Sequence, residues 1–100
     1  MKITINTGME RKISINYQTW SFSCFYTEEV DVDKEEEARK RRHHLRALSQ
    51  ASVYTDILTD MGRLRNAVPD RPDFKAQLDM LEREATDGLE AALKELKVGN

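Results

Sequence analysis

The residues best suited to chemistry lie in one basic run, residues 39–46, which reads Arg-Lys-Arg-Arg-His-His-Leu-Arg. On a helix each residue turns by about 100°, which places four of these side chains on one stripe. They are Arg39, Arg42, His43 and Arg46. Guanidinium and imidazole groups aligned in this way suit a row of phosphates or an acidic protein surface. The run therefore predicts a binding site for a nucleic acid or a nucleoprotein complex.

The same run has a second interpretation. An acidic residue stands four positions before each of three cations, in the pairs Glu35–Arg39, Glu36–Lys40 and Glu37–Arg41. Pairs with this spacing stabilise an exposed helix by about 0.2–0.5 kcal/mol each. The stripe would then be a solvated helix face that binds nothing. The sequence leaves both interpretations open.

Catalytic and metal-binding patterns are missing from the sequence. Neighbouring His43 and His44 point about 100° apart on a helix and cannot chelate one metal ion. Cys24, the one cysteine, lies in an apolar run and is typical of a small core residue. No phosphate-binding glycine loop, no HExxH pattern and no familiar Ser, His and Asp spacing occurs. We expect a protein that is not an enzyme, with no metal, no cofactor and no small-molecule substrate.

Composition narrows the class of protein further. The net charge of −2 argues against a uniformly basic coat protein and against a simple acidic mimic of DNA. No stretch approaches the ~20 apolar residues of a membrane span, and the N-terminus lacks a secretory signal pattern. One cysteine among 100 residues rules out an internal disulfide and fits a reducing compartment. We expect a cytoplasmic protein with no membrane partner.

The elements that must position the basic run change type near Asp33. Most β-branched and aromatic residues precede it, whereas Leu, Ala, Glu, Lys and Arg dominate after it. Strands followed by helices make an α+β fold. We expect one domain over residues 1–100, with a sheet at 1–32, a first helical segment at 33–66 and a last helix at 70–98.

Period-two alternation predicts an antiparallel sheet with one wet face before Asp33. We expect either a β-hairpin or a three-stranded sheet, with turns at residues 7–10 and 17–19. Phe25 falls on the face rich in Ser and Thr, and Glu28 falls on the apolar face. Either a bulge near residues 25–28 turns Phe25 inward, or its ring stays exposed to stack a base or fill a partner's pocket.

The first helical segment changes its apolar face part of the way along. Up to residue 52 the apolar face is narrow, and beyond that residue the apolar side chains centre on almost the opposite side. One straight helix cannot bury both faces against the same sheet. Either the helix breaks near 49–52, or its two halves pack on different partners. The second partner would be the last helix or a second copy of the chain.

A second copy is the basis of an alternative function, a homodimeric protein-interaction module built on amphipathic helices. Its interface would use the apolar stripes of both helices. The residues expected there are Ile57, Met61, Leu64, Leu78, Leu81 and Leu89.

Residues 12–23, which read KISINYQTWSFS and precede a charged helix, resemble small proteins of phages and other mobile elements. The likeness covers about a third of the chain and includes no catalytic motif. Such proteins include single-strand DNA accessory proteins and inhibitors of host defence such as anti-CRISPRs. The resemblance implies a non-catalytic protein that engages a nucleic acid or a nucleoprotein, for example a host defence complex. It transfers no individual functional residue.

Overall fold

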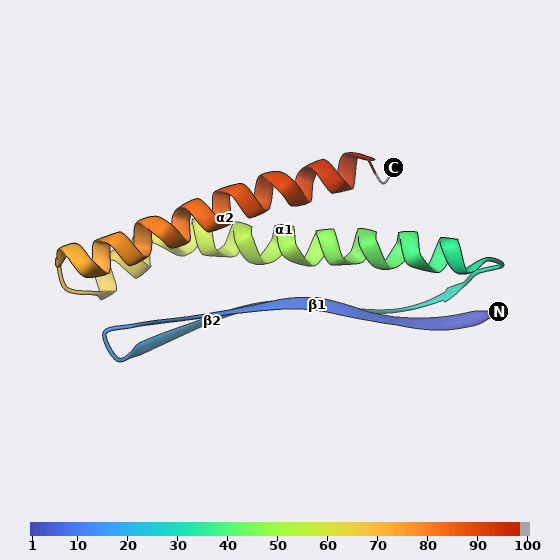
Figure 1. Ribbon diagram of the computed structural model, residues 1–100. Coiled ribbons are helices and arrows are strands. Elements are labelled where there is room, and N and C mark those ends of the chain that lie inside the picture. The colour runs from blue at the N-terminus through green and yellow to red at the C-terminus, as the bar shows by residue number, and fades with distance from the viewer. Residues whose placement is uncertain (99–100) are drawn as a thin grey trace.

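The computed structural model describes residues 1–98 and consists of a β-hairpin followed by two helices. The elements are β1 (Lys2–Ile15), β2 (Gln18–Asp31), α1 (Glu35–Ala67) and α2 (Pro72–Val98). α1 runs along the hairpin, and α2 doubles back along the side of α1 away from the hairpin (Figure 1). The fold is therefore α+β as predicted, with a hairpin rather than three strands.

The predicted turn at residues 7–10 and the predicted bulge at 25–28 are both wrong. β1 and β2 pair without interruption from Lys2–Asp31 to Ile15–Gln18. Gly8 lies inside β1 opposite Phe25 and does not have a positive φ. A Cβ on Gly8 would lie 2.6 Å from the Cys24 carbonyl oxygen and 2.8 Å from the Phe25 Cα. Glycine stands here because the two strands approach closely, and not because the chain turns.

The hairpin turns at Asn16 and Tyr17, whose φ angles are 52° and 64°. A two-residue connection with two positive φ angles is a type I′ turn, which favours Asn at its first position and Gly at its second. Tyr17 is fully exposed, so no packing compensates for the unfavourable backbone conformation of a bulky residue there.

Tyr17→Gly is expected to raise the free energy of unfolding by about 1 kcal/mol, because glycine removes the strain of a left-handed backbone at this position. Urea denaturation followed by circular dichroism measures the change. Tyr17→Ala is the control, since it removes the same ring and keeps the strain. Equal stability of the two variants would contradict the explanation.

Of the two alternatives for the first helical segment, the break near 49–52 does not occur, because α1 is continuous over 33 residues. Its second half packs on two partners at once, the hairpin and α2. Val53 and Ile57 in the second half join a core shared with β1 and α2, whereas Ala38 and Leu45 in the first half are buried outside that core. Ser49, fully buried where the faces change, donates its hydroxyl hydrogen to the Arg46 carbonyl at 2.8 Å.

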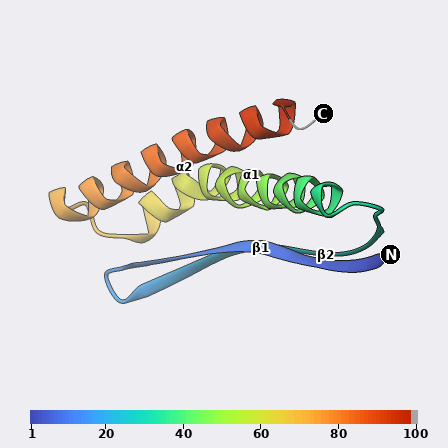
Figure 2. The same ribbon diagram turned by 45° about the vertical axis from the view of Figure 1, so that its right-hand side comes forward.

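The main core lies toward the turn of the hairpin, where both strands, α1 and α2 come together. Half-buried Trp20, Phe22 and Cys24 of β2 pack against it from the inner face of the hairpin. Its buried members are Ile13, Ile15, Val53, Ile57, Met61, Leu64, Phe74, Leu78, Leu81 and Ala85. The molecule is long and thin, 55 × 24 × 16 Å. α2 ends short of the start of α1, as two views show (Figures 1 and 2). Neither helix described over residues 1–98 is long and apolar enough to cross a bilayer.

Candidate nucleic-acid interface

The first half of α1 brings the predicted basic stripe together against β1. All four of its side chains are exposed, and they line a hollow of about 600 Å³ between α1 and β1. The lining residues are Thr7, Gly8, Arg39, Arg42, His43 and Arg46, which we call the basic groove.

A second hollow, of about 350 Å³, continues from the basic groove toward the start of α1. The two hollows share Arg39 and Arg42. Much of the second hollow is apolar, formed by side chains from the N-terminus, Val32 and Ala38. Glu35 is the one acidic residue that lines either hollow. The side of α1 that faces this edge of β1 therefore carries mainly positive charge.

Ion pairing within the basic run differs from the pairing predicted from the sequence. Of the three predicted pairs within α1, the structure forms one, Glu36–Lys40 at 3.7 Å. Arg41 instead reaches Glu28 on β2, with Nη2 2.9 Å from Oε2 and a second bond from Nε at 3.1 Å. This pair also explains why a carboxylate lies on the inner face of the hairpin. Among residues 1–98, no carboxylate lies within ion-pair distance of Arg39, Arg42 or Arg46.

Most of the arginines outside the basic groove pair with carboxylates in the described chain. Five of the nine arginines form ion pairs: Arg11 with Glu84, Arg41 with Glu28, Arg63 with Asp60, Arg65 with Asp79 and Glu82, and Arg71 with Asp73. The hydrogen bond that Arg11 donates to Glu84 raises the pKa of Arg11, and the one that Arg65 donates to Glu82 raises the pKa of Arg65. Three of the four remaining arginines line the basic groove. Free guanidinium groups are thus concentrated at one place in a protein whose net charge is −2.

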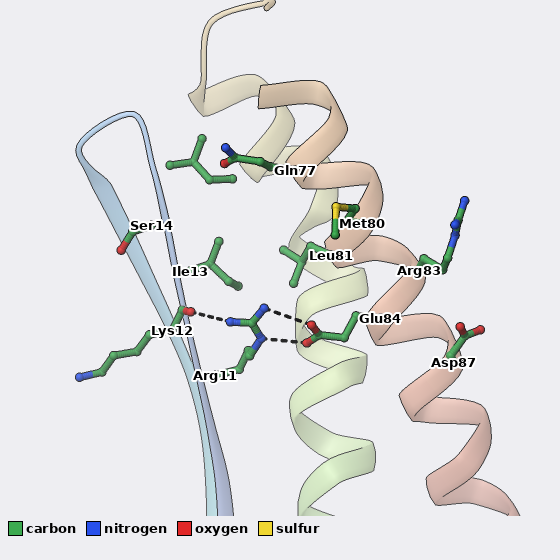
Figure 3. Close-up of a pocket in the computed structure, with 11 residues that line it drawn as sticks. Arg11, Lys12, Ile13, Ser14, Gln77, Met80, Leu81, Arg83, Glu84 and Asp87 are labelled. Carbon is green, nitrogen blue, oxygen red and sulfur yellow. Dashed lines mark hydrogen bonds and ion pairs between the residues drawn. The ribbon is translucent and has the colours of Figure 1, made fainter. Parts of the chain in front are cut away.

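A different hollow, of about 530 Å³, lies between β1 and α2 (Figure 3). Arg11 crosses it, donating from Nε and Nη2 to the two carboxylate oxygens of Glu84 at 2.8 and 3.1 Å. Its Nη1 donates to the Lys12 carbonyl at 2.9 Å. All three guanidinium nitrogens are bound within the protein, so this arginine ties α2 to β1. Across residues 1–98, no three His, Cys, Asp or Glu side chains form a cluster that could hold a metal ion.

Phe25 is separate from the basic groove. With no bulge to turn it inward, its ring lies on the outer face of the hairpin and is 66% exposed. It still touches the groove indirectly, because Gly8 is both its partner on β1 and a lining residue of the groove.

The residues predicted for a homodimer interface are used inside one chain instead. Ile57, Met61, Leu64, Leu78 and Leu81 are at most 6% exposed, and Leu89 is half-buried. The five buried residues belong to the core in which α1 and α2 of the same chain meet, which is the alternative of pairing within the same chain. In this fold the five buried side chains are therefore not accessible to a second copy of the chain.

Sequence reasoning missed Thr7 and Gly8, because nothing in the local pattern of β1 ties these residues to a helix more than thirty positions away. Comparison of the chain with protein-family models, with curated proteins and with solved structures gives no match.

Proposed function

We propose that this protein is a non-catalytic nucleic-acid-binding protein that holds a phosphate backbone in the basic groove. The concentration of unpaired arginines in that groove is the observation that carries the proposal. Guanidinium groups bind phosphate through paired, charge-assisted hydrogen bonds, and an arginine already held by a carboxylate is not free to do so.

The spacing of the groove arginines supports the same ligand. Arg39 and Arg46 lie seven positions apart on α1, with Arg42 between them, which is about 10 Å at 1.5 Å per residue. One strand of a duplex carries a phosphate about every 3.4 Å along the axis, so about three phosphates fit this length. His43 adds a further hydrogen-bond donor on the same stripe.

A role as inhibitor of a host defence complex, suggested by the resemblance of residues 12–23, would use the same groove. The ligand would then be the nucleic acid of that complex. The proposal therefore covers free nucleic acid and a nucleoprotein alike, and its first test needs only the nucleic acid.

That test is a salt titration of the wild-type protein with a fluorescent oligonucleotide, read by anisotropy. Release of counterions from about three phosphates predicts a slope of log K against log salt of about −2 to −3. Affinity should then fall by roughly 20-fold to 60-fold between 50 and 200 mM salt. Absence of binding at 50 mM salt, to single-stranded and duplex DNA and to RNA, would overturn the proposal.

A further inference from the structure

The ring of Phe25 and the basic groove meet at a single residue. Gly8 lines the groove from β1, and Phe25 is its partner on β2. A Cβ on Gly8 would collide with the Phe25 ring, so the ring lies directly against the Gly8 backbone. No side chain at Gly8 obstructs the path from the groove over β1 to the ring.

The outer face around Phe25 is electrically balanced. Its charged side chains and the N-terminus form close ion pairs, in each case within 4 Å: Lys2–Glu29, Lys12–Glu10 and the Met1 amine with Asp31. The register places Ser23 and Thr27 on either side of Phe25 in β2, with Asn6 and the paired Glu10 across from them in β1. Thr27 donates to the Asn6 Oδ1 at 2.9 Å. This face therefore does not repel a polyanion, and its polar groups suit the edges of a base.

We infer that the ligand is single-stranded, with its backbone in the basic groove and one base turned over β1 onto the Phe25 ring. The inference rests on the proposed function and narrows its substrate class. A duplex must break a base pair to supply that base, at a cost of a few kcal/mol, whereas a single strand has free bases. Stacking on an aromatic ring suits every base, so the site selects strandedness rather than sequence.

The test compares wild type with Phe25→Leu on an oligothymidine of about 12 nucleotides and on a duplex of the same length. Wild type should prefer the single strand. Phe25→Leu should weaken its binding about 5-fold to 100-fold, as expected for the loss of one stacked base. The salt slope should not change, because no phosphate contact is lost. The affinity for the duplex should not change either.

Failure of the stacking site and failure of the proposed function give different results. The stacking site is refuted if Phe25→Leu binds the single strand as tightly as wild type does, or if it loses as much affinity for the duplex as for the single strand. Either result leaves the proposed role of the basic groove intact. If wild type binds neither ligand at low salt, the proposed function fails and this inference fails with it. Phe25→Tyr keeps an aromatic ring at this position and should bind oligothymidine as tightly as wild type does. Tyr17→Gly, which removes an exposed aromatic at the hairpin turn, should leave affinity unchanged.

A spectroscopic signal separates stacking from a structural role of the ring. In a Trp20→Phe background, Phe25→Trp places the only tryptophan of the chain on the outer face. Oligothymidine should quench its fluorescence in proportion to the bound fraction. Binding without quenching would overturn the inference.

Discussion

Replacing Arg39, Arg42 and Arg46 together with alanine is expected to weaken oligonucleotide binding about 100-fold at 0.1 M salt. Each phosphate contact on a single strand contributes about 0.7 to the slope of log K against log salt. Three contacts therefore account for about two decades of affinity at that salt concentration, and the slope should fall by about 2. Anisotropy titrations at several salt concentrations give both values.

The matched control removes three cations from α2: Lys75, Arg83 and Lys97. These are also exposed and lack an ion pair among residues 1–98. Both variants lose three positive charges, so any difference between them reports position rather than net charge. We expect the control to lose only a few-fold in affinity. Equal losses would mean that attraction is spread over the whole surface, and the groove would have no special role.

The loss of affinity in the groove variant should not come from a loss of folding stability. All three groove arginines are exposed and make no ion pair within the described chain, so their removal should change the free energy of unfolding by less than about 0.5 kcal/mol. Arg41→Ala behaves differently, because it strands the Glu28 carboxylate on the inner face of the hairpin. A loss of stability in Arg41→Ala alone would support the division of the basic run into structural and binding residues.

The fold class could be predicted because its signals are local. Period-two alternation and helical periodicity each depend on neighbours within a few residues. The two strand predictions that failed depended on a distant partner. Gly8 looks like a turn residue in isolation, and only its position opposite Phe25 explains it.

The site divides in the same way. Helix geometry alone placed Arg39, Arg42, His43 and Arg46 on one stripe, and the structure keeps them together. Whether their charges were free could not be read from the sequence. That depended on where the carboxylates of the first turn lie, and in the described chain Glu35 forms no ion pair with Arg39.

The change of apolar face along α1 predicts a large effect of a single core truncation. Ile57→Ala is expected to lower the free energy of unfolding by about 3–4 kcal/mol, since truncating a buried Ile costs about 2–5 kcal/mol. Ile57 is fully buried in the core cluster that joins the hairpin, α1 and α2, so a cavity there loosens both contacts of α1. Leu58→Ala, next in sequence and half-buried, should cost clearly less.

Urea denaturation of Ile57→Ala, followed by circular dichroism and by Trp20 fluorescence, measures the loss and its cooperativity. The two signals should shift together, because helix content and the environment of Trp20 depend on the same cluster. A loss below about 1 kcal/mol, or separated transitions, would show that α2 docks independently of the hairpin.

The affinity of Ile57→Ala for the oligonucleotide is a second measurement on this variant. Ile57 lies eleven residues beyond Arg46 on α1, about three helical turns, and no residue of α2 lines the basic groove. While the variant remains folded, its affinity for the oligonucleotide should therefore equal that of wild type. A weakened affinity would mean that the α1–α2 core is needed to hold the first half of α1, and therefore its arginines, in place beside β1. The groove would then depend on all four elements and not on α1 and β1 alone.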